Sequence, residues 1–156
     1  MKGCLFYLKG KAEPWADIAA AEYAEKISRF IPFTREPLKS KSADRANADE
    51  KKRAEAEAVL SKINPRDNVI LFDESGQKFK NSEEFSRELI KIISSGSQRV
   101  VLVIGGPYGF SEKVMVRAQS RWSLSGLTMN HHVAQIVALE QIYRAMTIWK
   151  GIPYHN

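Results

Sequence analysis

Residues 101–110 read VLVIGGPYGF, four apolar residues that run directly into a loop with three glycines. A short apolar run that meets glycines is typical of a buried strand ending in a tight turn. Gly105, Gly106 and Gly109 either serve that turn alone or let a ligand approach bare backbone. The spacing G-G-P-x-G fits neither the dinucleotide fingerprint nor a P-loop, so binding of dinucleotides or nucleoside triphosphates is weakly supported.

Strand-like and helix-like segments alternate on both sides of this stretch. Residues 2–8 and 68–73 read as strands, and residues 31–38 contain two prolines and read as an edge strand at best. Helices are expected from Pro14 to about residue 30, in the second part of 39–60, after Asn81, from Ser111 through Trp122, and from about residue 131 to 148. Glu74, Ser75 and Gly76 read as a turn.

This alternation predicts an α/β fold with a mainly parallel sheet, and neither an internal repeat nor a linker divides residues 1–156 into more than one domain. In such sheets ligands bind beyond the carboxyl ends of the strands. The loops after Asp73 and Ile104 are therefore the expected positions of a site.

The composition is that of an ordinary globular protein, with 44% hydrophobic and 27% charged residues in 156. No apolar run approaches the roughly 20 residues that cross a bilayer, and the apolar stretch near the N-terminus is too short for a secretory signal. We therefore expect no membrane partner and a cytoplasmic location. The net charge of +6, from 24 basic and 18 acidic residues, favours a polyanionic partner, RNA first.

The sequence offers little support for a metal site. Cys4 is the only cysteine and lies in an apolar run, so it is expected to be a small buried hydrophobe. His131 and His132 are adjacent in a segment that reads as extended, where their side chains would point apart, and His155 is the only other histidine. One of the pair is expected to cap the last helix. The last helix is apolar on more than one side, which fits either a subunit interface or a central core helix.

Three further stretches make the chain resemble a known family. VIGGPYGFS at 103–111, RWSLSGLTMNH at 121–131, and EQIYRA at 140–145 with the closing PYH are similar to the small bacterial methyltransferases of the SPOUT superfamily. These enzymes modify N3 of a pseudouridine in 23S rRNA. The resemblance also reaches DESG at 73–76 and the N-terminal strand and helix, so it spans nearly the whole chain.

The resemblance implies a SPOUT-type fold with a deep C-terminal trefoil knot in about residues 99–156, an exception to unknotted topology. It implies S-adenosylmethionine as the cofactor, which carries no phosphate. It also implies a homodimer that methylates the helix 69 hairpin of 23S rRNA, on the assembled 70S ribosome. The cofactor contacts that carry over by position are Phe72, Gly105, Leu124, Ser125, Gly126, Leu127, Thr128 and Met129.

The resemblance further implies that the C-terminal tail helps to complete the partner's site. Arg144, Tyr154 and His155 are then expected near the target base, with Arg144 offsetting negative charge on the ring and His155 accepting the N3 proton. Lys39, Lys41, Arg45, Arg121 and Lys150 are candidates for contacts with RNA phosphates. Two alternatives stay open, a knotted RNA-binding or ribosome-assembly protein without catalysis, and a doubly wound nucleotide-binding enzyme.

Overall fold

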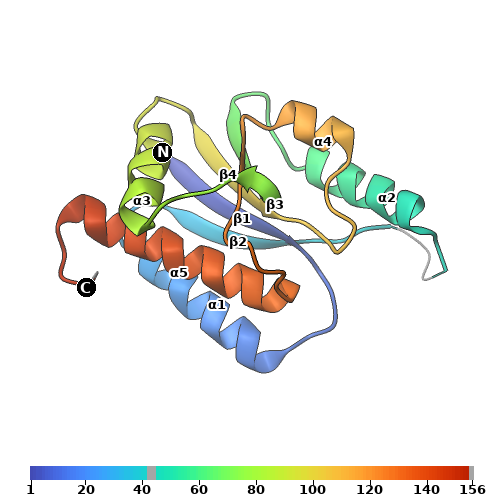
Figure 1. Cartoon of the computed structure of the whole chain (residues 1–156), viewed down its shortest axis with the longest axis horizontal. Helices are drawn as coiled ribbons and strands as arrows, with labels where there is room; N and C mark the ends of the chain where they lie inside the picture. The colour runs from blue at the N-terminus through green and yellow to red at the C-terminus, as the bar shows by residue number, and fades with distance from the viewer. Residues whose placement is uncertain (42–44, 155–156) are drawn as a thin grey trace.

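The computed structural model describes residues 1–41 and 45–154, and its centre is a parallel sheet (Figure 1). Five strands lie in the order β2-β1-β4-β3-β5, and every neighbouring pair is parallel. Their bounds are β1 Lys2–Leu8, β2 Phe33–Leu38, β3 Asp67–Gln77, β4 Arg99–Ile104 and β5 Ser120–Trp122. The predicted strands at 2–8, 68–73 and 99–104 are confirmed, and the proline-containing segment forms the edge strand β2.

Five helices cover both faces of this sheet (Figure 1). They are α1 Pro14–Ile27, α2 Ala48–Leu60, α3 Ser82–Ile93, α4 Glu112–Arg117 and α5 His131–Lys150. Side chains of α1, α3 and α5 share one buried cluster with the sheet, and side chains of α2 and α4 share the other. The chain therefore has the α/β architecture of a doubly covered sheet that the sequence predicted.

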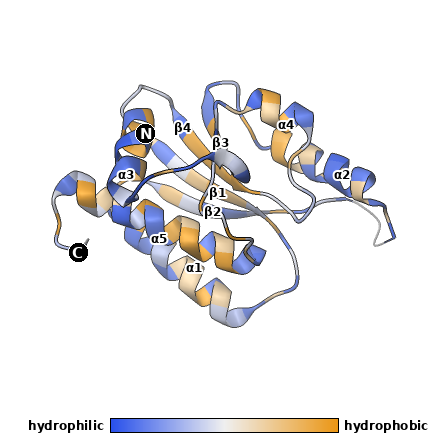
Figure 2. Cartoon of the chain, viewed as in Figure 1, coloured by the Kyte–Doolittle hydropathy of each residue, from blue (hydrophilic) through white to orange (hydrophobic). Residues whose placement is uncertain are grey.

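The two buried clusters follow from the two-residue period of a strand. On β4, Val101 and Val103 belong to the cluster under α2 and α4, while Leu102 and Ile104 belong to the cluster under α1, α3 and α5. Figure 2 shows hydrophobic colour along most of β4, as expected of a central strand that is buried on both faces. Cys4 on β1 is 1% exposed, and burial raises the pKa of its thiol to about 12, so the predicted role as a buried hydrophobe is confirmed.

Three local predictions were wrong. The segment from Glu74 to Gly76 is the extended end of β3, which pairs with β5 after a register shift between Phe72 and Gln77. A Cβ on Gly76 would lie 2.6 Å from the backbone carbonyl carbon of Arg121, so this glycine permits a close approach of two backbones. The helix that was expected to reach Trp122 is shorter than predicted: α4 ends at Arg117, and Trp122 lies on β5.

The third error concerns the start of α5. Asn130 caps this helix by accepting a hydrogen bond from the backbone N–H of His132 at 2.9 Å, so neither histidine is the cap. Asparagine is a stronger N-cap than histidine because its short side-chain oxygen reaches the free N–H groups of the first turn. Within the residues described, no helix is both long and apolar enough to cross a membrane.

Candidate functional site

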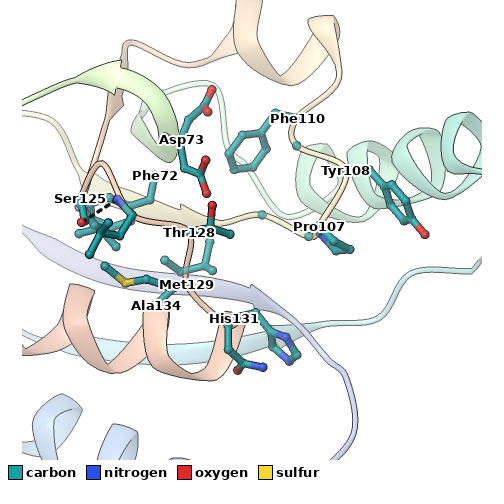
Figure 3. Close-up of a pocket in the computed structure, with 18 residues that line it drawn as sticks. Phe72, Asp73, Pro107, Tyr108, Phe110, Ser125, Thr128, Met129, His131 and Ala134 are labelled. Atoms are coloured by element: carbon teal, nitrogen blue, oxygen red, sulfur yellow. Dashed lines mark hydrogen bonds between the residues drawn. The ribbon is translucent and has the colours of Figure 1, made fainter.

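A cavity of about 630 Å³ lies where β3 and β4 end, at the carboxyl edge of the sheet (Figure 3). Its walls come from the end of β3, the loop after β4, the loop between β5 and α5, and the start of α5. The residues that line it are Phe72, Asp73, Glu74, Ile104, Gly105, Gly106, Pro107, Tyr108, Gly109, Phe110, Leu124, Ser125, Leu127, Thr128, Met129, Asn130, His131 and Ala134. Both segments that the sequence marked as ligand sites thus meet in one cavity, although the one after Asp73 belongs to β3 and is not a loop.

The three glycines of the loop after β4 occupy positions that exclude or tolerate a side chain for different structural reasons. A Cβ on Gly105 would lie 2.8 Å from the ring of Phe110, which is buried against the loop. A Cβ on Gly106 would lie 2.5 Å from a carboxylate oxygen of Glu55, the flexible end of an α2 side chain. Gly109 has a φ of +76°, and its N–H bonds to the carbonyl of Gly106 at 3.2 Å. Gly109 therefore serves the turn, as expected, whereas Gly105 makes room for a ring.

The loop between β5 and α5 forms the opposite wall and is held by short local hydrogen bonds. Ser123 Oγ donates to the carbonyl of Ser125 at 3.0 Å, and Ser125 Oγ accepts from the N–H of Leu127 at 3.0 Å. Figure 3 shows Ser125, Thr128 and Met129 facing Phe72 and Asp73 across the cavity. These serine hydrogen bonds fix the local course of the loop.

The structure brings together seven of the eight residues expected to contact the cofactor. They are Phe72, Gly105, Leu124, Ser125, Leu127, Thr128 and Met129. Gly126 is not among the lining residues, and a Cβ on it would meet nothing within 4 Å. Phe110, Asp73 and His131 were not predicted as cofactor contacts, although each lies at the end of a stretch that the sequence analysis had marked.

The charge of the cavity is negative. Among the lining residues there is neither lysine nor arginine, while Asp73 and Glu74 bring two carboxyl groups from the end of β3. Asp73 accepts a hydrogen bond from the N–H of Ser75 at 3.1 Å, and Arg121 approaches its other oxygen at 3.7 Å. Such a lining suits a neutral or cationic ligand and does not suit a phosphate group.

His131 lies at the edge of the cavity beside the loop after β1. Its Nε2 is buried without a hydrogen-bond partner among the described residues, 3.1 Å from the position of a Cβ on Gly10. Burial and the neighbouring His132 lower the pKa of His131, so its ring is neutral at pH 7. The two rings are 4.1 Å apart because both residues lie in the first turn of α5, which corrects the extended arrangement expected from sequence. In the described part of the chain, no group of histidine, cysteine, aspartate and glutamate side chains could hold a metal ion.

The residues expected to carry out catalysis form a separate cluster at the other end of α5. Arg144 donates through Nε and Nη2 to Glu140 Oε1 at 3.1 and 2.6 Å, and Tyr154 donates its hydroxyl to the same oxygen at 3.1 Å. The guanidinium lies 4.8 Å from the centre of the Tyr154 ring. His155 lies outside the described residues. The structure thus brings Arg144 and Tyr154 together, but not at the cavity.

The separation of the two groups follows from helix geometry. His131 lines the cavity and Arg144 is 13 residues further along the same helix. At 1.5 Å per residue this amounts to about 20 Å along the axis. The cavity and the cluster of Glu140, Arg144 and Tyr154 cannot act on the same atom within one chain.

Comparisons with known proteins show which family the chain resembles. A family described as "Predicted SPOUT methyltransferase" matches residues 1–155. A protein of Bdellovibrio bacteriovorus named "Ribosomal RNA large subunit methyltransferase H" is 46% identical over 156 residues, which is 100% of this chain and 99% of that protein. Proteins of the same name from Bacteroides thetaiotaomicron and Christiangramia forsetii are 37% and 40% identical, covering 100% and 86% of this chain and 99% and 85% of theirs.

The chain also resembles solved structures. One of them is that of a TrmH/SpoU tRNA modifying enzyme of A. aeolicus, with a TM-score of 0.49 and 14% identity over 96% of this chain and 77% of that one. This likeness is too slight to support a conclusion, whereas the family match and the identities of up to 46% extend over the full length. The chain therefore belongs to the SPOUT methyltransferase family.

Proposed function

We propose that the chain transfers a methyl group from S-adenosylmethionine to N3 of a pseudouridine in the helix 69 hairpin of 23S rRNA, on the assembled 70S ribosome. The observation that carries this proposal is the match over the whole chain to proteins named ribosomal RNA large subunit methyltransferase H. A ribosomal substrate places the activity in the cytoplasm.

The cavity fits the cofactor of this family. S-adenosylmethionine supplies a methyl group that is activated by its bond to a sulfonium cation. A cavity of about 630 Å³ is in the usual range for small-molecule sites. Asp73 and Glu74 supply negative charge close to the cavity, whereas a phosphate-bearing nucleotide would find no cationic side chain among the described lining residues. This argues against the doubly wound nucleotide-binding alternative.

Within this proposal the residues of the two facing loops hold the cofactor. Phe72, Leu124 and Met129 cover its apolar parts, while Gly105, Ser125, Gly126, Leu127 and Thr128 offer backbone groups and a hydroxyl. Exclusion of water and alignment of the reacting atoms account for most of the rate in a direct transfer of this kind. The trefoil knot is part of the same proposal, in which the loop between β5 and α5 and the loop after β4 form two walls of the cofactor cavity.

The reacting centre is proposed to combine two subunits of a homodimer. Arg144 and Tyr154 lie about 20 Å along α5 from the cavity of their own chain, so within this proposal they act at the cavity of a second copy. Trp15 and Ile18 on α1 are 56% and 70% exposed, and exposed apolar side chains of this size suit burial against another subunit. This reading favours the subunit interface over the purely internal role for the last helix.

The charges at the tail define the roles of its residues. The hydrogen bonds from its guanidinium to Glu140 raise the pKa of Arg144, so the guanidinium stays charged and can offset negative charge on the target ring. Burial, together with Glu140, raises the pKa of Tyr154 to about 12, so its hydroxyl stays protonated at neutral pH. Tyr154 can therefore donate a hydrogen bond but cannot accept the N3 proton, and His155 remains the proposed acceptor.

The test is transfer of labelled methyl groups to 70S ribosomes, large subunits and bare 23S rRNA, with the modified base located by mass spectrometry. Label on N3 of a pseudouridine supports the proposal. Binding of the RNA without any transfer supports the non-catalytic alternative. Calorimetry with S-adenosylmethionine, NAD and ATP distinguishes the proposed function, which requires binding of S-adenosylmethionine, from the nucleotide-binding alternative, which requires tight binding of NAD or ATP.

Mixed dimers test whether the site combines two subunits. One chain carries Gly105→Val in the cavity and the other carries Tyr154→Phe in the tail, and each is weakly active alone. If the site is shared, each mixed dimer keeps one intact site, and random mixing restores about a quarter of wild-type activity. If each chain works alone, mixing restores nothing.

A further inference from the structure

The carboxyl edge of the sheet continues beyond the cavity as a row of exposed basic loops. The register pairs Leu8 of β1 with Leu38 of β2, and Tyr7 with Ile104 of β4. The next residue of β1, Lys9, donates its N–H to the carbonyl of Leu38 at 2.9 Å. The loops that follow β4, β1 and β2 therefore lie side by side, at about 4.8 Å from strand to strand.

These neighbouring loops differ in charge from the cavity. Lys9 and Lys11 follow β1, and Lys39 and Lys41 follow β2. All four side chains are exposed, and none forms an ion pair with a residue in the described part of the chain. Gly10, between the first two, lies against His131 at the rim of the cavity. Four ammonium groups that are not paired within the described residues thus begin directly beside a cavity whose described lining has none.

An exposed aromatic side chain belongs to the same edge of the sheet as these lysines, since β4 pairs with β1. Tyr108 lies in the loop after β4, is 42% exposed, and has the Nζ of Lys51 6.0 Å from its ring centre. Figure 3 shows its ring directed away from the cavity, while Phe110 of the same loop points inward. Exposed aromatic rings next to cationic side chains are typical surfaces for unstacked nucleotides, since every base can stack and every phosphate attracts a cation.

We propose that the RNA strand next to the target nucleotide follows this edge, with one base stacked on Tyr108 and its phosphates beside Lys9, Lys11, Lys39 and Lys41. The inference rests on the proposed function, which it deepens by assigning the path of the substrate. The target base enters the acidic cavity, where negative charge serves a cationic methyl donor, while the phosphates stay outside on the basic loops. The sequence alone had marked Lys39 and Lys41, but the sheet order adds Lys9, Lys11 and Tyr108.

The test compares charge removal at the two ends of the sheet. Lys9→Gln with Lys11→Gln removes two charges from the carboxyl edge. Lys62→Gln with Arg66→Gln is the matched control, because these exposed residues precede β3 at the amino edge. Binding to large ribosomal subunits is measured at several salt concentrations. We expect the first pair to weaken binding and to lower the log–log salt slope by about 1.4, at about 0.7 per phosphate contact, and the control pair to change neither.

Tyr108 is tested separately by the steady-state kinetics of methyl transfer. Loss of one base stack in Tyr108→Ala should raise KM for ribosomal substrate by about fivefold to 100-fold, whereas Tyr108→Phe should stay near wild type. Affinity for S-adenosylmethionine, measured by calorimetry, should be unchanged in both charge-removal pairs. In Tyr108→Ala, a rise in KM with little change in kcat separates loss of an RNA contact from damage to the cavity.

The outcomes separate the inference from the function on which it rests. Equal effects of the two lysine and arginine pairs on binding, or an unchanged KM in Tyr108→Ala, would overturn the path. A wild-type chain that binds subunits without methylating them would defeat the proposed function. In that case the binding comparison of the two pairs would still decide the path.

Discussion

The contact between Gly105 and Phe110 allows a prediction whose size follows from the structure. In Gly105→Ala the new Cβ would lie 2.8, 3.0 and 3.2 Å from three atoms of the Phe110 ring. Carbon atoms in contact prefer about 3.5–4.0 Å, so the ring or the loop has to move by roughly half an ångström or more. Phe110 is only 8% exposed and packs in the cluster under α2 and α4, so the movement meets resistance.

We expect two measurable effects of Gly105→Ala. Overpacking of this kind lowers the free energy of unfolding by about 1–3 kcal/mol, which urea denaturation measures. Because Phe110 and Gly105 both line the cavity, affinity for S-adenosylmethionine should fall as well, and Gly105→Val should abolish binding. Gly106→Ala is the matched control, since its Cβ would displace only the flexible end of Glu55 and should cost less than about 1 kcal/mol.

A double-mutant cycle identifies the cause. Phe110→Leu alone leaves a partly empty site and should itself be destabilising. If the ring is what opposes a Cβ at position 105, Gly105→Ala should cost about 1 kcal/mol less in the Phe110→Leu background than in the wild type. Equal costs in the two backgrounds would refute this reasoning and place the need for glycine in the backbone or in the ligand.

Three further predictions concern other positions. Gly76→Ala should lower the free energy of unfolding by about 1–3 kcal/mol, because its Cβ would meet the Arg121 backbone at 2.6 Å. A Cβ on Gly126 would meet nothing within 4 Å, so Gly126→Ala should change the free energy of unfolding by less than about 0.5 kcal/mol in the same urea assay. A loss of S-adenosylmethionine affinity in calorimetry would then reveal a contact between the cofactor and the backbone at this position. Asp67 is 2% exposed and paired with Arg99, so Asp67→Asn should lower the free energy of unfolding by about 3 kcal/mol. Burial alone would raise the pKa of Asp67, but hydrogen bonds from Arg99 and the Asn64 N–H outweigh it and lower the pKa. In the wild type the stabilisation by this pair is therefore complete above about pH 5 and is lost as pH falls below about 4. Acid titration of stability in both proteins checks the sign, and an equally steep loss in Asp67→Asn would contradict it.

The sequence predicted the parts of the fold that local patterns encode. Continuous apolar runs gave β1, β4 and the first half of β3, and the cap residues Asn81 and Ser111 marked the starts of α3 and α4. The single-domain organisation stays a prediction. The end of β3 and all of β5 were missed, because three residues are too few to show a period and because aspartate, serine and glycine also favour turns.

The same distinction holds for the site. The glycine loop and the segment 124–129 were found through motifs, and the parallel sheet then explains why they meet, since the carboxyl ends of β3 and β4 share one edge. The distance between the cavity and Arg144 could not be predicted from motifs, because sequence order carries no information on which subunit a helix end serves. Only the length and path of α5 show that EQIYRA and the glycine loop lie apart.

The placement of charge along the carboxyl edge links the two functions that the chain has to combine. A net charge of +6 predicts affinity for RNA but does not predict where the RNA lies. The sheet order puts Asp73 and Glu74 at the end of β3, and puts Lys9 and Lys39 at the ends of the next strands beyond β4. Within the proposed path, a phosphate is therefore repelled from the cavity and attracted to the adjoining loops. For a nucleotide at this edge, the favourable arrangement places the base toward the methyl donor and the RNA backbone over the lysines. The electrostatic field of these side chains would therefore help to orient the substrate before any base-specific contact forms.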